Sequence, residues 1–195
     1  MGKWRRINHW TYLFSVVFIL LSAASLAAFA GGYRDFAAAL VANLPGEARF
    51  RPDLEAELAA LANHYRVGEG INSLQSSDEF SLAARAQAAD MMRNNFSGHR
   101  SSSGVGFEGR MRAIGGKIER FGTIGENVAR DSRKTPADAR KAAALFQQWI
   151  DSRPHRFNLR KAGYAFVSTG VVQKGNTIWA VQIFWGTPRE RGLFQ

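Results

Sequence analysis

The sequence contains no cysteine and no internal repeat. Disulfides, thiol catalysis and cysteine-ligated metal sites are therefore excluded. An exported chain without disulfides must rely on core packing alone for its stability. This is more typical of a bacterial secreted or periplasmic protein than of a small extracellular domain from an animal or plant.

Acidic residues are few relative to basic ones, with 16 Asp and Glu against 26 Lys and Arg, so the formal net charge is +10. A positive chain attracts anionic envelope polymers or lipid head groups. The arginines are scattered rather than clustered, so a solvated basic surface is the simpler interpretation. We expect a monomer without a nucleic-acid partner, and a lipid or anionic cell-envelope polymer remains the alternative partner.

The first thirty residues have the layout of a secretory signal peptide. Three basic residues precede an uncharged apolar run over residues 12–29, and Ala28-Phe29-Ala30 matches the A-x-A cleavage pattern. An uncleaved membrane anchor is the alternative, because the apolar run is nearly long enough to span a bilayer. In both cases Gly31 and the residues after it lie outside the cytoplasm, secreted or periplasmic.

The remaining chain divides into a short lead-in and one domain. Residues 31–50 are rich in Ala and Gly and form a linker or a lead-in helix, and residues 51–195 form the domain. Apolar residues at helical spacing predict helices that begin near residue 53, near residue 78, at residue 107 and at residue 135. For the last of these we expect Thr135 as the cap and Pro136 in the first turn, with the end just before Pro154.

Two later segments predict a β-hairpin. Residues 164–172 and 177–185 are rich in aromatic and β-branched residues, and Lys174-Gly175-Asn176 separates them as a turn. The second arm carries apolar residues at both alternating sets of positions, so both faces of the sheet should be covered. The fold class is therefore α+β, with helices packed on an antiparallel sheet.

A third extended segment, residues 123–129, carries a carboxylate between apolar residues. Ile124, Glu126 and Val128 share one face of an extended chain. A buried carboxylate is costly unless another group pairs with it. Either Glu126 makes a structural ion pair with one of the arginines, or it belongs to a site with His99 and His155, each of which follows a predicted helix end.

The motifs of the chain, taken together and in order, resemble the CAP superfamily, which includes cysteine-rich secretory proteins, insect venom antigens and plant pathogenesis-related proteins. The resemblance extends from about residue 54 to residue 184, is closest to a cysteine-free bacterial branch of the superfamily, and is carried by four segments. They are Phe96-Ser97-Gly98-His99, Gly125-Glu126-Asn127-Val128-Ala129, Trp149-Ile150-Asp151-Ser152-Arg153-Pro154-His155-Arg156 and Trp179-Ala180-Val181-Gln182-Ile183-Phe184.

This resemblance implies a three-layer α-β-α sandwich with helices on both sides of a small antiparallel sheet. It also implies a surface cleft in which His99, Glu126 and His155 converge, a site that holds zinc or another divalent metal in some members of the family. A second glutamate of the family pattern is replaced here by Ser152. Two imidazoles and one carboxylate still suit Zn²⁺ with an open fourth position.

Three functions follow as alternatives. The resemblance favours a non-enzymatic extracytoplasmic binding module, since common activities of the family include binding sterols and other lipids. The second is a metal-assisted hydrolase of peptides or envelope material, with His99, Glu126 and His155 as ligands and Glu126 or a nearby group as the base. The third is a structural envelope protein in which these residues only hold loops together.

Overall fold

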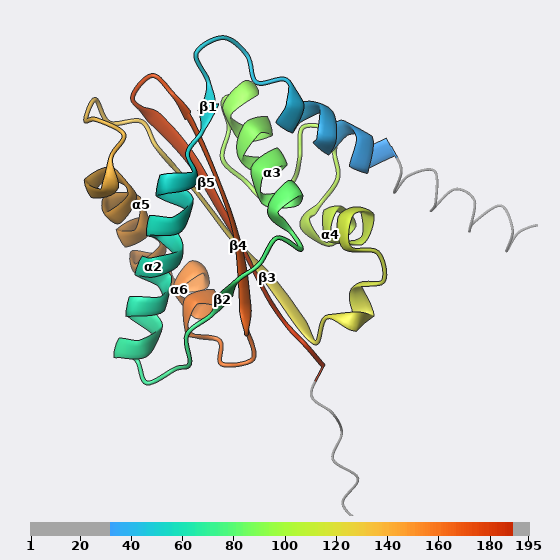
Figure 1. Cartoon of the computed structure of the whole chain (residues 1–195), viewed down its shortest axis with the longest axis vertical. Coiled ribbons are helices and arrows are strands. Elements are labelled where there is room, and N and C mark those ends of the chain that lie inside the picture. The colour runs from blue at the N-terminus through green and yellow to red at the C-terminus, as the bar shows by residue number, and fades with distance from the viewer. Residues whose placement is uncertain (1–31, 189–195) are drawn as a thin grey trace, which may run out of the picture.

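The computed structural model describes residues 32–188, so the predicted signal peptide or anchor lies outside the described residues (Figure 1). Its centre is a five-stranded sheet in which β1, β4, β5 and β3 follow one another in space and β2 pairs with β4. All pairings are antiparallel except that of β2 with β4. The strands are β1 (Arg49–Phe50), β2 (Gln75–Ser76), β3 (Thr123–Asp131), β4 (Phe166–Lys174) and β5 (Thr177–Gly186).

The predicted hairpin is confirmed as β4 and β5. The two strands meet at a turn in which Gly175 has a φ of +56°, a conformation that costs a residue without Cβ little. β3 pairs along the whole of β5, with Glu126 opposite Ile183. β3 is therefore one outer strand of the sheet, and β4, partly covered by the short β1 and β2, forms the other edge.

One face of the sheet is covered by a helix over residues 32–42, by α3 (Ser81–Arg93) and by α4 (Phe107–Gly115). α3 is rich in alanine, and its buried alanines allow it to approach the sheet closely. The closest approach is at Gly170, where an added Cβ would lie 2.5 Å from backbone atoms of α3. Trp179, Val181 and Ile183 of β5 belong to this side of the core.

The other face is covered by α2 (Pro52–Gly68), α5 (Ala139–Asp151) and α6 (Arg153–Arg160). Ile178, Ala180 and Phe184 of β5 point to this side, so alternate residues of one strand serve two cores. Figure 1 shows the sheet between the two groups of helices. The predicted three-layer α-β-α sandwich is confirmed.

The helix predicted from residue 135 has the wrong start and the right end. It begins at Ala139, because Asp138 is its cap and accepts the Lys141 amide, and it ends at Asp151, as predicted, where Ser152 has an extended backbone. The chain then begins a new helix, α6, which was not predicted. Pro154 lies in its first turn, a position to which proline is well suited.

A fully buried arginine joins α2 to the segment between α6 and β4. Arg66 donates hydrogen bonds to the carbonyl oxygens of Asn72, Leu159 and Lys161 at 2.9–3.0 Å, and to that of Tyr164 at 3.4 Å. Burial lowers the pKa of its guanidinium, but four carbonyl dipoles surround the charge. The sequence did not distinguish this arginine from those on the surface.

None of the helices within residues 32–188 is both long and apolar enough to cross a bilayer.

Candidate functional site

Glu126 lies in the middle of β3 and is paired with a buried arginine. Its side chain is 1% exposed and points to the α3 and α4 side of the sheet, where the Arg110 side chain is 0% exposed. Arg110 Nη2 lies 2.8 Å from Oε1 and 2.7 Å from Oε2 of the carboxylate. Of the two roles left open for Glu126, the structural ion pair with an arginine is therefore present.

His99 is the second partner of the same carboxylate. Its Nδ1 lies 2.9 Å from Glu126 Oε1, and its side chain is 52% exposed. Arg110 also holds the loop, because Nη2 donates to the His99 carbonyl oxygen at 3.1 Å. If Nδ1 carries the proton in this contact, Nε2 keeps its lone pair. Glu126 thus orients a half-exposed imidazole.

His155 reaches the same place from the first turn of α6. The centroids of the His99 and His155 rings are 6.1 Å apart. Burial lowers the pKa of the His155 imidazole from its usual 6.5, His99 lowers it further, and Glu126 opposes both effects. The net shift favours the neutral form of the His155 imidazole. We refer to His99, Glu126 and His155 as the histidine site.

Amide side chains fix the strand against α6. Asn127 Nδ2 donates to the His155 carbonyl oxygen at 3.1 Å, and Asn158 Nδ2 donates to the Glu126 carbonyl oxygen at 3.0 Å. Gly125 leaves room for Tyr164, because an added Cβ would lie 2.1 Å from the Tyr164 hydroxyl oxygen. Burial raises the pKa of that tyrosine to about 12. The Gly-Glu-Asn motif is therefore a packing and hydrogen-bonding unit as well as the source of the carboxylate.

The structure thus brings the three predicted residues together, but it gives them unequal roles. Both oxygens of Glu126 already accept hydrogen bonds from Arg110, so the carboxylate is poorly placed as a metal ligand. Within residues 32–188 no group of three or more His, Asp or Glu side chains is arranged to hold a metal ion. The two imidazoles are the donors that remain available, with Glu126 behind His99 as its hydrogen-bond partner.

Arg110 and Asn158 were missed by the sequence analysis. Arg110 is sixteen residues before Glu126 and on a different element, α4, and Asn158 lies on the helix that was not predicted. A carboxylate on the apolar face of a strand did signal that a cation would be near. No spacing rule could select one arginine from the many in the chain.

A pocket of about 330 Å³ lies beside the histidine site, and we call it the edge groove. It follows the outer edge of β3, and its wall includes Ser97, Val128, Arg130, Trp149, Ser152 and His155. Ser152, which occupies the position of the second family glutamate, is the cap of α6 and makes no side-chain capping bond. Ser152 also lines the groove.

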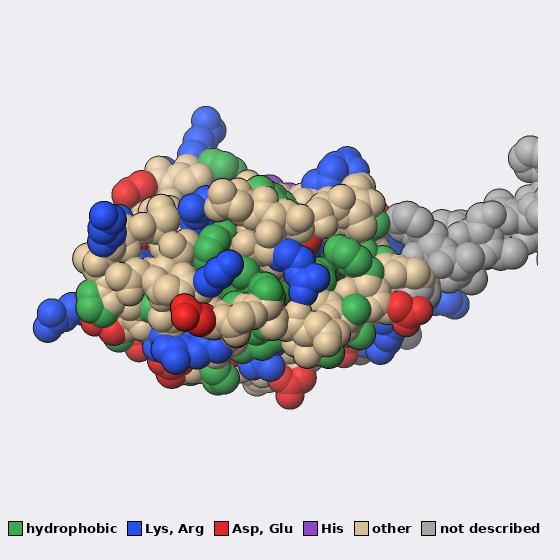
Figure 2. All heavy atoms as spheres, turned by 90° about the horizontal axis from the view of Figure 1, so that it is seen from above, with side chains coloured by type: hydrophobic (Ala, Val, Ile, Leu, Met, Phe, Trp, Pro, Cys, Tyr) green, Lys and Arg blue, Asp and Glu red, His purple; other side chains and the backbone are tan. Residues whose placement is uncertain are grey.

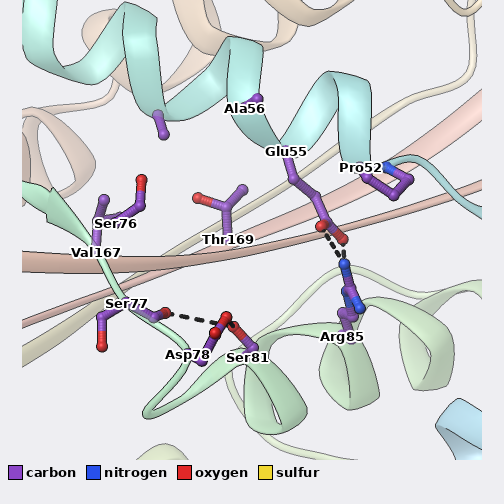
Figure 3. Close-up of a pocket in the computed structure, with 11 residues that line it drawn as sticks. Pro52, Glu55, Ala56, Ser76, Ser77, Asp78, Ser81, Arg85, Val167 and Thr169 are labelled. Atoms are coloured by element: carbon purple, nitrogen blue, oxygen red, sulfur yellow. Dashed lines mark hydrogen bonds and ion pairs between the residues drawn. The ribbon is translucent and has the colours of Figure 1, made fainter.

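A second pocket, of about 350 Å³, lies at the opposite edge of the sheet between α2 and α3 (Figure 3). Arg85 Nε and Nη2 lie 2.9 Å and 2.6 Å from the two carboxylate oxygens of Glu55. Glu55 Oε1 also accepts the Val171 amide at 3.1 Å. This pocket contains no histidine, and its carboxylate links α2, α3 and β4.

The basic residues do not form a single patch on the face seen from above. Figure 2 shows Lys and Arg side chains spread over this face, with Asp and Glu side chains among them. The predicted scattering of charge is visible there, and a binding site for a polyanion is not evident from charge alone.

The fold is a three-layer sandwich, and two histidines lie close together at one edge of its sheet. Comparison of the sequence with known families identifies the class of domain that has this arrangement. Residues 59–184 match the family model described as "CAP: Cysteine-rich secretory protein family". The chain belongs to the CAP family, and its lack of cysteine fits the predicted cysteine-free branch.

Bacterial relatives carry the same domain. The uncharacterized protein YkwD of Bacillus subtilis (strain 168) is 32% identical over 129 residues, which cover 66% of this chain and 46% of that protein. The chain therefore matches about half the length of this relative.

Two solved structures share the fold. One is an extracellular protein containing an SCP domain from Bacillus anthracis str. Ames, with a TM-score of 0.57, 24% identity and coverage of 70% of this chain and 41% of that one. The other is an outer surface protein from Borrelia burgdorferi, with a TM-score of 0.58, 15% identity and coverage of 69% of this chain and 93% of that one.

Proposed function

We propose that this chain is a non-enzymatic binding module that acts outside the cytoplasm and uses the cleft at its histidine site. The observation that carries this proposal is the pairing of Glu126 with Arg110 and His99. A general base needs a lone pair that can reach a substrate proton. Glu126 is 1% exposed and both of its oxygens are engaged, so it serves to position other groups.

Export is proposed from the signal-like first thirty residues. It is supported by the structural neighbours, which are described as an extracellular and an outer surface protein. The net charge of +10 favours lipid head groups or anionic envelope polymers as surroundings. We propose that the chain acts there as a monomer.

A divalent metal such as Zn²⁺ would be held at this site by His99 Nε2 and by His155. The residues fit such an ion only in part, because structural and catalytic zinc sites use at least three protein ligands and the carboxylate here is engaged by Arg110. Glu126 would keep His99 in the tautomer that leaves Nε2 free. A bound metal would supply an open position for a donor group of a ligand.

A structural role is the second candidate, and the hydrogen bonds around Glu126 favour it. They connect β3 to α4, to the His99 loop and to α6. In this case the exposed part of the histidine site would bind nothing, and the network would only hold three segments together.

Calorimetric titration of the full chain with zinc chloride separates the candidates, beside His99→Ala and His155→Ala. His64→Ala is the matched control, since His64 is exposed on α2 and has no role in the cleft. We expect one weak site that is lost in both cleft variants and kept in the control. Binding that weakens equally in all three variants, or no binding to the folded wild type, would favour the structural role.

A further inference from the structure

On its outer edge, away from β5, β3 has backbone groups that pair with no other strand within residues 32–188. In an antiparallel pair, alternate residues direct their N–H and C=O toward the neighbouring strand or away from it. The Glu126 carbonyl oxygen accepts from Asn158 of α6, so Glu126 faces away from β5. In the unbroken register of β3 with β5, Val128 and Arg130 face outward as well.

These outward groups open into the edge groove. α6 covers the edge at Glu126 through Asn158, but beyond it Val128 and Arg130 form the floor of the groove. Within residues 32–188 no backbone or side-chain donor or acceptor is bonded to the outward amide or carbonyl of Val128 or Arg130. The Val128 residue is only 6% exposed, so a ligand can reach these unpaired groups only through the groove, and unpaired strand edges are templates for pairing with another extended chain.

Side chains on the walls of the groove add unpaired donors. Trp149 is 0% exposed and lines the groove, yet its indole N–H has no partner among the described residues. The Arg130 Nε–H also lacks a partner there, and its guanidinium lies 5.4 Å from the Trp179 ring centroid without an ion pair to a described acid. A buried N–H without an acceptor is rare enough to need an explanation.

We propose that the edge groove binds an extended peptide segment, which pairs with the backbone of Val128 and Arg130 as an added strand and places an acidic side chain near Arg130. Donors and acceptors that recur every second residue, roughly 6.6 Å apart, match an extended peptide. A lone anion would satisfy the donors but not the two outward carbonyls. The inference rests on the proposed binding function and names its ligand class.

The test begins with selection of peptides that bind the full chain from a displayed library of random twelve-residue sequences. The strongest binder is then synthesised with a fluorescein label and titrated by anisotropy against the wild type, Val128→Pro and Thr169→Pro. Proline at either position removes an outward N–H from an edge and leaves the bonds to β5 intact. Thr169 lines the pocket at the other edge of the sheet, so its variant is the matched control (Figure 3).

We expect Val128→Pro to weaken peptide binding about tenfold, the effect of losing one or two hydrogen bonds. Thr169→Pro should bind as the wild type does. A labelled peptide that binds Val128→Pro with unchanged affinity would overturn the inference, as would the absence of any enriched peptide. Inorganic phosphate that displaces the peptide at equal affinity would also overturn it, in favour of anion binding.

A second measurement changes the peptide and uses only the wild-type protein. N-methylation of the peptide at successive positions should abolish binding to the wild type only at alternate residues, because every second N–H faces β3. An equal effect at every position would contradict strand pairing. Peptide binding could instead be lost in His99→Ala and remain unchanged by Val128→Pro and by the position of the N-methyl group. That result would support the proposed binding function and contradict strand pairing at β3.

Discussion

Two carboxylates at opposite edges of the sheet are each paired with an arginine, and they differ in what else they hold. Glu55 shares its oxygens between Arg85 and the amide of Val171, so every partner belongs to the framework. Glu126 shares its oxygens between Arg110 and His99, and the imidazole is half exposed. An arginine–glutamate pair thus joins framework elements at one edge and orients a half-exposed imidazole ring at the other.

The two ion pairs also differ in how deeply they are buried. Arg110 and Glu126 are almost fully buried, whereas the Arg85 side chain is 34% exposed and that of Glu55 is 11% exposed. A buried charge loses more when its partner is removed, because water cannot replace the partner. Loss of the partner charge should therefore reduce the free energy of unfolding more at the Arg110–Glu126 pair than at the Arg85–Glu55 pair.

The largest expected effect is that of Glu126→Gln, which leaves Arg110 buried without a counter-charge. We expect the free energy of unfolding to fall by about 3–5 kcal/mol, as measured by urea denaturation. A double variant that also carries Arg110→Met should recover part of this loss. A loss below about 1 kcal/mol in Glu126→Gln would show that the pair is not structural, and abolished turnover at full stability would instead favour the hydrolase.

The next effect concerns Gly125, which precedes Glu126, and Gly170, which precedes the Val171 amide that Glu55 accepts. A Cβ at Gly170 would lie 2.5 Å from the backbone of α3, while a Cβ at Gly125 would meet the side chain of Tyr164. A side chain can move more easily than a helix, so Gly170→Ala should cost about 3 kcal/mol and Gly125→Ala about 1 kcal/mol. Thermal denaturation of both variants measures the order, and the reverse order would contradict the proposed rigidity of the α3 contact.

Glu55→Gln should have a smaller effect on stability than Glu126→Gln. Because Arg85 is partly solvated, we expect a loss of about 1 kcal/mol in urea denaturation. Zinc and peptide binding at the other edge should not change. Equal losses in Glu55→Gln and Glu126→Gln would remove the distinction between the two edges.

The smallest effect is a dependence of stability on pH just below 6.5, which we expect from His155. The native pKa of His155 lies below 6.5, so between that pKa and 6.5 the unfolded chain binds more protons than the folded chain. Stability should therefore fall as pH decreases through this range and level off below the native pKa. His155→Asn should flatten this part of the stability–pH curve, and an unchanged curve would contradict the cause given for the shift.

Much of the fold could be predicted because it depends on local patterns. The alternation along residues 177–185 predicted a strand with two covered faces, and β5 has them. The alternation around Glu126 predicted a carboxylate facing the core. α6 was missed because Pro154 has two opposite effects: it disfavours helix in the residue before it, and it suits the first turn of a new one.

The site could be predicted only in outline. His99, Glu126 and His155 carried family motifs, but Arg110 and the outward backbone of Val128 carried none. Their roles depend on the register of β3 with β5 and on the packing of α4, which are set by contacts between segments far apart in sequence. For the same reason the sequence offered an arginine partner for Glu126 as one alternative but could not identify it as Arg110, whose contact weakens the three-ligand metal hypothesis.

The buried Arg66 has a consequence for a chain without cysteine. Its guanidinium donates to four carbonyl groups, one in the loop after α2, one in the last turn of α6 and two between α6 and β4. Unlike a disulfide, these hydrogen bonds form without an oxidant and are not broken by a reductant. The connection that anchors α6, and with it His155, is therefore independent of the redox state of the compartment in which the chain folds.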